Sequence, residues 1–304
     1  MSILPMSPMR LTLPALLLLL SACGPRQLEP DADIICDLCD GWNEPQQPFR
    51  IHGNTWYVGT AGLSSILIET DDGLVLIDGA LPQSAALIAA NIQSLGFEPR
   101  DLKAILVSHV HFDHVGGVAA LQRLSNATVY TSQAGREPLV AGQLSADDPQ
   151  FDATAAYGDF PPVRKVVAIG DGDVVSVGSA GSAGSVDVKA VYTPGHAPGG
   201  TSWTWQSCAL GNCYNIVYGD SLSAVSAPGF EFSSSGVADD IIASAGIIGD
   251  LDCDIFLSPH PFFFGMRDKL ERFDQGNPFV QNVACLMYAD SMLGWLERRL
   301  EAER

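Results

Sequence analysis

The stretch Ser108–His114, which reads Ser-His-Val-His-Phe-Asp-His, decides how the rest of this chain is interpreted. It directly follows the apolar run Ala104–Val107 and leads into Val115-Gly116-Gly117. Imidazole nitrogen is a good zinc ligand, and a carboxylate is an acceptable one. His109, His111, Asp113 and His114 cannot all lie on one face of a regular helix or strand. This HxHxDH pattern therefore indicates a metal-binding loop at the carboxyl end of a buried strand.

Two further histidine motifs also follow segments that read as strands. Thr193-Pro194-Gly195-His196 comes after the expected strand Val186–Tyr192, and Ser258-Pro259-His260-Pro261 comes after the apolar run Ile255–Leu257. Either histidine alone is weak support for a metal site. Together with the HxHxDH loop they indicate a two-zinc hydrolytic site, whereas the remaining histidine, His52, is given no role.

The N-terminus is predicted to be a targeting signal and not part of the folded domain. Leu11–Leu20 is almost continuously apolar and is preceded by Arg10. This apolar run is too short for a comfortable membrane span, and the segment has the layout of a secretory signal. Leu20-Ser21-Ala22-Cys23 resembles the lipobox of bacterial lipoproteins. The resemblance implies that residues 1–22 are removed and that Cys23 is lipidated. We expect a periplasmic protein anchored to the outer membrane, with a soluble periplasmic protein as the alternative.

Charge and composition restrict the partners of the chain. With 35 acidic and 16 basic residues, its formal net charge is -19. Such an acidic surface repels nucleic acid and anionic lipid, so we expect no nucleic-acid partner and a small-molecule substrate. The only membrane attachment expected is the lipid on Cys23.

The number of cysteines agrees with export. If one of the seven cysteines, Cys23, carries lipid, an even number remains, which suggests disulfides in an oxidising compartment. Other pairings are open, but proximity favours Cys208–Cys213, Cys253–Cys285 and Cys36–Cys39. A redox or metal role is the alternative for Cys36-x-x-Cys39, although the chain has no second CxxC that would complete a zinc site.

Residues 23–47, rich in prolines, acids and glutamines, read as a tether, and residues 48–304 read as one domain. Strands and helices alternate in both halves of that domain, and hairpins are present. The pattern predicts an α/β layered domain with metal at one edge of its sheets. Residues 180–185 read as a flexible loop. The expected strands are Ser64–Glu69, Leu74–Asp78, 104–107, Val174–Val177, Val186–Tyr192, Trp203–Ser207, Ile216–Tyr218 and Asp254–Leu257, with a strand start at Gly53–Gly59; the expected helices are Ser84–Leu95, Val118–Leu124, Ala238–Ile248 and Gln281–Glu303.

From about Phe49 to its end the chain resembles the metallo-β-lactamase superfamily and, within it, the subclass B3 enzymes. The resemblance rests on the HxHxDH loop, Pro194-Gly195-His196 with Pro198–Trp205, Asp220–Ser223 and Ser258–Pro261. It implies an αββα four-layer sandwich with two zinc ions between the sheets. The implied ligands are His109, His111 and His196 for the first zinc and Asp113, His114 and His260 for the second.

The same resemblance implies a β-lactamase that opens the β-lactam amide of antibiotics through a metal-bound hydroxide. Asp113 would be the catalytic carboxylate that orients the hydroxide. Ser221 and Ser223 would bind the substrate carboxylate, and Asp78 would support the ligands from behind.

One motif leaves a second function open. Tyr218-Gly219-Asp220-Ser221 resembles the B3 pattern, but it also resembles the Gly-Asp-Thr of glyoxalase II-like enzymes and lactonases, whose aspartate bridges the metals. If Asp220 bridges two zincs, a zinc hydrolase of a lactone or thioester is the alternative. An exported binding protein without catalysis would require an incomplete metal site, and the six matched ligands argue against it.

Overall fold

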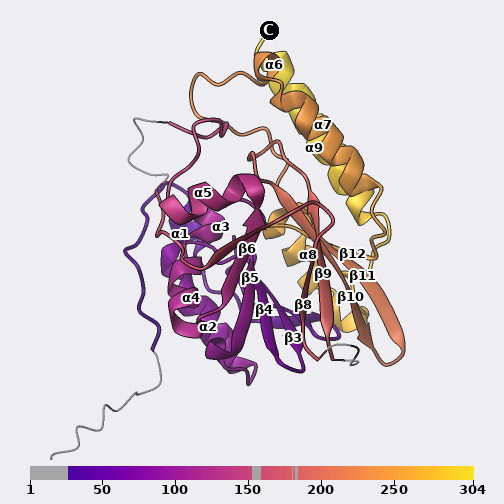
Figure 1. Cartoon of the computed structure of the whole chain (residues 1–304). Helices are drawn as coiled ribbons and strands as arrows, with labels where there is room; N and C mark the ends of the chain where they lie inside the picture. The colour runs from indigo at the N-terminus through magenta and orange to yellow at the C-terminus, as the bar shows by residue number, and fades with distance from the viewer. Residues whose placement is uncertain (1–26, 153–158, 180, 182–183) are drawn as a thin grey trace, which may run out of the picture.

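The computed structural model describes residues 27–152, 159–179, 181 and 184–304. Two β-sheets face each other, and helices cover the outer surface of each sheet (Figure 1). The αββα four-layer sandwich expected from the sequence is therefore confirmed. The predicted signal peptide and Cys23 lie outside the described residues, as do residues 180, 182 and 183 of the expected loop at 180–185.

The first sheet has seven strands in the order β1-β2-β3-β4-β5-β6-β7. Its strands pair antiparallel from β1 to β4 and parallel from β4 to β7. The strands are β1 (Phe49–His52), β2 (Thr55–Tyr57), β3 (Ile66–Thr70), β4 (Gly73–Ile77), β5 (Leu102–Leu106), β6 (Thr128–Ser132) and β7 (Val166–Ile169).

The second sheet has five strands in the order β12-β11-β10-β9-β8. Because β10 is antiparallel to both β9 and β11, and β11 is parallel to β12, the strands β9, β11 and β12 end at the same edge. These strands are β8 (Val174–Val177), β9 (Val186–Tyr192), β10 (Thr201–Ala209), β11 (Asn212–Tyr218) and β12 (Ile255–Leu257).

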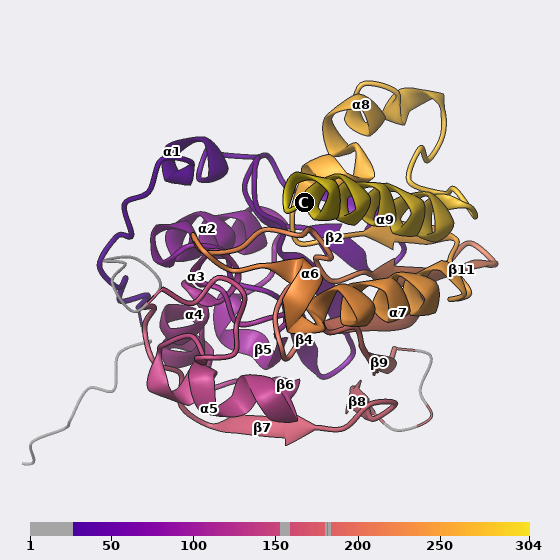
Figure 2. The same cartoon turned by 90° about the horizontal axis from the view of Figure 1, so that it is seen from above.

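The helices and 3-10 turns connect the strands and form the outer layers. Figure 2 shows α7 and α9 beside the second sheet and α2 and α4 beside the first. They are α1 (Cys39–Trp42), η1 (Pro82–Ser84), α2 (Ala85–Ser94), η2 (Pro99–Asp101), α3 (Phe112–Val115), α4 (Val118–Ser125), α5 (Gln133–Ala141), α6 (Phe232–Ser235), α7 (Val237–Gly249), η3 (Pro261–Phe264), α8 (Met266–Leu270), η4 (Phe273–Gln275) and α9 (Ala284–Ala302).

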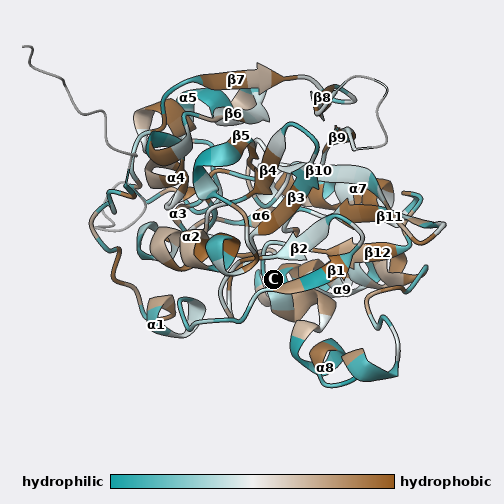
Figure 3. Cartoon of the chain, turned by 90° about the horizontal axis from the view of Figure 1, so that it is seen from below, coloured by the Kyte–Doolittle hydropathy of each residue, from teal (hydrophilic) through white to brown (hydrophobic). Residues whose placement is uncertain are grey.

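Strand β4 shows how the core is divided between the layers. Val75 and Ile77 belong to the cluster that includes Trp203 of the opposite sheet. Leu74 and Leu76 point the other way, into the cluster formed with α2 and α4. Both faces of this strand are thus buried, so β4 reads as a continuous apolar run, and Figure 3 shows β3 and β4 as hydrophobic along most of their length.

Several elements differ from the sequence-based expectation. The sequence predicts no element between residues 128 and 169, yet this segment forms β6, α5 and β7. Helix α5 contains Gly135 and Pro138, which are poor helix formers, and β7 is an edge strand with Val167 exposed. The final helix begins at Ala284 and not at Gln281.

The described part of the predicted tether lies on the domain. The Gln83 side-chain amide donates to the carbonyl of Ile34 at 2.8 Å, and Arg123 pairs with Asp31 at 2.9 Å. The structure also joins the three cysteine pairs that proximity favoured, Cys36–Cys39, Cys208–Cys213 and Cys253–Cys285. Among the described residues, no helix has the length and apolarity needed to cross a bilayer.

Candidate metal centre

The loops that follow β5, β9 and β12 meet at one edge of the sandwich and bring the predicted ligands together. In each of two groups the potential ligand atoms all lie within 4.8 Å of one another. The groups are adjacent, because the rings of His109 and His114 are 4.3 Å apart between centroids. The first group is His109, His111 and His196; the second is Asp113, His114 and His260.

In the first group, the protein holds the rear nitrogen of two histidines. Asp220 Oδ1 lies 2.7 Å from His109 Nδ1, and the Ser223 carbonyl lies 2.8 Å from His196 Nδ1. His109 Nε2 is buried and has no hydrogen-bond partner among the described residues. Fixing Nδ1 selects the tautomer whose Nε2 lone pair is free, which is the arrangement that metal-binding histidines require.

The loop at residues 148–150 holds the third histidine of this group. The Asp148 carboxylate lies 3.0 Å from His111 Nε2, which leaves His111 Nδ1 on the side of the group. There, Gln150 Nε2 lies 3.4 Å from His111 Nδ1 and 3.3 Å from His196 Nε2. A side-chain amide thus occupies the open face of the first ligand group.

The second group is arranged around Asp113. Its Oδ2 lies 3.2 Å from His114 Nε2 and 3.5 Å from His260 Nε2. The Gly62 carbonyl lies 3.3 Å from His260 Nδ1, and the Trp42 ring covers the His260 ring at 5.4 Å between centroids. His260 therefore presents Nε2 to Asp113 and has its opposite nitrogen and one face held by residues from the N-terminal part of the chain.

Burial sets the charge of the ligand groups. It lowers the pKa of His196 to about 3 and that of His260 to about 4, with the nearby histidines acting in the same direction. Burial also acts to raise the pKa of Asp113, but His114 and His260 outweigh it, so this carboxylate stays ionised. At His111 the Asp148 carboxylate outweighs burial and raises the pKa. Imidazole nitrogens beside an ionised carboxylate are the donor set of zinc, and the two groups fit two zinc ions.

Asp78 supports the loop at its start. It directly follows β4 and has a left-handed backbone with φ of 59°. Its carboxylate accepts hydrogen bonds from the Ser108 amide at 2.8 Å, the Ser108 hydroxyl at 2.7 Å and the Tyr218 hydroxyl at 2.8 Å. Asp78 thus connects both sheets to the residue that precedes His109, and it does so without contacting a ligand.

The two serines named from the sequence have different surroundings. Ser221 Oγ is buried and has no hydrogen-bond partner among the described residues. Ser223 Oγ lies 3.2 Å from His196 Nδ1, so this hydroxyl already supports a ligand histidine. Of the two, Ser221 has the hydroxyl without a partner among the described residues.

Sequence reasoning missed three residues of the site, Asp148, Gln150 and Trp42. They lie in segments without hydrophobic periodicity, and they reach the histidines only through the tertiary fold. The acid-and-amide sequence Asp147-Asp148-Pro149-Gln150 carries no spacing signal that could have identified them.

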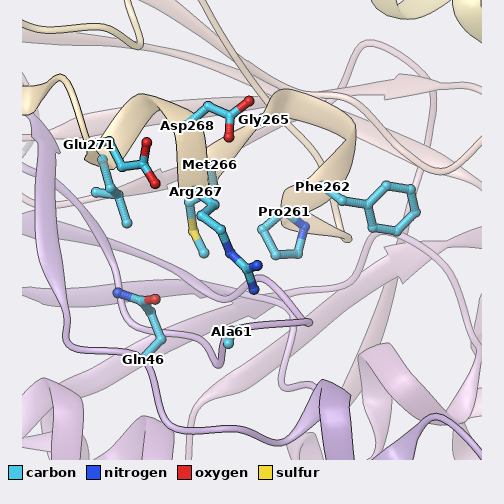
Figure 4. Close-up of a pocket in the computed structure, with 10 residues that line it drawn as sticks. Gln46, Ala61, Pro261, Phe262, Gly265, Met266, Arg267, Asp268 and Glu271 are labelled. Atoms are coloured by element: carbon cyan, nitrogen blue, oxygen red, sulfur yellow. The ribbon is translucent and has the colours of Figure 1, made fainter.

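A cleft of about 750 Å³ lies beside the second group. Figure 4 shows the Arg267 guanidinium directed toward Ala61, between Pro261 and Gln46. Pro261 and Ala61 neighbour His260 and Gly62 in the sequence, so the cleft adjoins the metal-binding edge. None of the six ligand candidates lines it.

A family model and solved structures that match this chain are described as metallo-β-lactamases. A family model described as the metallo-β-lactamase superfamily matches residues 59–208. The crystal structure of a subclass B3 metallo-β-lactamase from a soil metagenome library, MEM-A1, is 41% identical, with a TM-score of 0.81, and the match covers 86% of this chain and 98% of that one. The Rm3 metallo-β-lactamase is 43% identical, with a TM-score of 0.83 and coverage of 89% and 99%.

A curated relative of another activity is more distant. An N-acyl homoserine lactonase of Bacillus thuringiensis is 26% identical over 159 residues, which is 44% of this chain and 54% of the lactonase. The chain thus spans about half the length of the curated relatives it matches.

Proposed function

Because the chain belongs to the metallo-β-lactamase superfamily, we propose that it is a zinc-dependent β-lactamase of the subclass B3 type. The observation that carries the proposal is the pair of three-residue ligand groups at one edge of the sandwich. This arrangement occurs in a chain that resembles subclass B3 enzymes over nearly their whole length.

The residues of the second group have the charge and position needed for hydrolysis. Zinc ions held by the two groups would supply Lewis acidity and a water whose pKa is lowered to about 7. Asp113, ionised and almost fully buried, accepts a hydrogen bond from the attacking water and aims it at the substrate carbonyl. The water is the nucleophile, so no covalent intermediate with the protein forms.

The substrate is a small molecule with a carboxylate, as β-lactam antibiotics are. Ser221, with its unpartnered buried hydroxyl, donates a hydrogen bond to that carboxylate, and Ser223 contributes from beside His196. This fixes one end of the substrate next to the first ligand group.

The alternative function is hydrolysis of a lactone or thioester, and it requires Asp220 to bridge the two metals. The Asp220 carboxylate instead lies 2.7 Å from the rear nitrogen of His109, and it belongs to neither ligand group. The position of Asp220 therefore favours the β-lactamase over the lactonase.

The test compares substrates and metal together. Purified protein is assayed with a penicillin, a cephalosporin, an N-acyl homoserine lactone and a thioester, each with and without a chelator. We expect chelator-sensitive hydrolysis of the β-lactams and little hydrolysis of the other two. Lactone hydrolysis without β-lactam hydrolysis would contradict the proposal.

We also propose that the chain is exported and anchored through lipidated Cys23. The lipobox-like Leu20–Cys23 and the absence of aspartate at Gly24 and Pro25 support anchoring to the outer membrane. The three cysteine pairs suit an oxidising compartment. Cys23→Ala should move the protein from the membrane fraction to the soluble fraction, which cell fractionation detects. Retention of this variant in the membrane fraction would count against lipidation.

A further inference from the structure

Tyr288 of helix α9 makes two hydrogen bonds to the loop that follows β11. Its hydroxyl donates to the carbonyl of Asp220 at 2.7 Å and accepts from the amide of Leu222 at 3.0 Å. The side chain is 3% exposed, so water does not compete for these contacts. One phenol thus fixes the backbone on both sides of Ser221.

This loop supports the first ligand group from behind. The Asp220 carboxylate holds Nδ1 of His109, and the Ser223 carbonyl holds Nδ1 of His196. Between them, Ser221 presents its unpartnered hydroxyl. A shift of the loop backbone would therefore move two of the three first-group histidines and the proposed substrate contact together.

The position of Tyr288 is itself fixed by the outer layer of the sandwich. Its ring packs against Phe256 of β12 at 4.5 Å and against Phe263 at 5.7 Å between centroids. The Cys253–Cys285 pair joins the start of α9 to the residues just before β12. Helix α9 is thus a fixed support for the loop.

We propose that Tyr288 of helix α9 is a positioning residue. Its hydroxyl holds the backbone of the loop after β11 and thereby positions the first ligand group and Ser221. This inference rests on the proposed function for its substrate part, but not for its metal part. Residues that hold metal ligands from behind typically change metal affinity by about 10- to 100-fold when altered. Because Tyr288 acts through Asp220 and Ser223, we expect an effect of about tenfold, at the low end of that range.

Zinc affinity in two backgrounds tests the metal part. His260→Ala leaves only the first group intact, and His196→Ala leaves only the second. Adding Tyr288→Phe should weaken zinc binding about tenfold in the His260→Ala background and leave it unchanged in the His196→Ala background, by chelator competition. Equal weakening in both backgrounds, or no weakening in either, would overturn the proposal.

Tyr192→Phe is the matched control, because the Tyr192 hydroxyl also connects two backbone groups, donating to Ile169 and accepting from Gln133. It should change zinc affinity in neither background. Thermal unfolding of the metal-free variants separates general destabilisation from loss of the metal site. If Tyr288→Phe raises the KM for a β-lactam and Tyr192→Phe does not, the substrate part holds; an unchanged KM would remove that part while the zinc result stands on its own.

Discussion

His109 and Asp220 form the contact on which the choice between two functions depends. The carboxylate lies on Nδ1, so Nε2 is the nitrogen left for metal, and Asp220 belongs to neither ligand group. The neighbouring sequence Gly219-Asp220-Ser221 could be aligned with lactonases or with β-lactamases. The hydrogen bond favours the β-lactamase reading of this motif, because it commits one carboxylate oxygen of Asp220 to the rear nitrogen of His109.

Asp220→Ala tests this contact. Removing the carboxylate frees the His109 ring to rotate and to change tautomer, so zinc affinity of the first group should fall by about 10- to 100-fold. Asp220→Asn keeps an oxygen acceptor for Nδ1–H and should lose much less. Chelator competition gives both values, and equal losses for the two variants would show that the carboxylate charge, and not the hydrogen bond, is what matters.

Ser221→Ala tests the proposed substrate contact. Losing a hydrogen bond to a charged carboxylate should cost about 1.5–3 kcal/mol, or roughly ten- to a hundredfold in kcat/KM. The measurement compares a β-lactam with its carboxylate methyl ester, for which the loss should nearly vanish. If the ester shows the same loss as the free acid, Ser221 does not bind the carboxylate.

At the scale of elements, the loops after β5, β9, β11 and β12 carry the site. The turn between β9 and β10 must approach this site closely. A Cβ atom on Gly200 would lie 2.5 Å from Asp220 Oδ2 and 2.5 Å from the Thr193 carbonyl. The absence of a side chain at Gly200 therefore leaves room for the carboxylate that holds His109.

Gly200→Ala should destabilise the fold by about 1–3 kcal/mol, because the added methyl overpacks this contact. Gly246→Ala is the control: it lies inside α7 with nothing within 4 Å of the added Cβ, so it should be neutral or stabilising by up to about 1 kcal/mol. Urea unfolding measures both. A neutral Gly200→Ala would mean that the turn can relax away from Asp220.

The elements that were predictable share a physical cause. Strands β5 and β12 are buried runs followed by ligands close in sequence, and β4 is a buried run followed by the supporting Asp78, so periodicity and motif appear together. The four-layer fold and the ligand set followed from these local signals and from the resemblance that they support. Asp148 and Tyr288 left no such signal in the sequence. Asp148 contacts a residue 37 positions away and Tyr288 contacts one 68 positions away, so only the folded chain brings these residues together.

Lys269 tests how burial of a charge affects the whole molecule. It is nearly buried in α8 beside the Phe279 ring, and burial and then Arg272 lower its pKa to about 8 from 10.5. The folded state therefore disfavours its charged form, and this penalty is present below pH 8 and disappears as the pH approaches 10.5. Lys269→Met should raise the urea midpoint at pH 7 and raise it less at pH 9.5; a gain that is equal at both pH values would contradict the shifted pKa.

The central claim for the whole molecule is that two zinc ions, held between two sheets by six side chains from three strand ends, open a β-lactam ring. The most direct test is a zinc titration of the chelated, metal-free protein, with the rate of cephalosporin hydrolysis measured at each point. We expect no hydrolysis without zinc and recovery that is complete at two equivalents per chain. Full activity at one equivalent would contradict the dinuclear site, and no hydrolysis at any zinc content would contradict the β-lactamase.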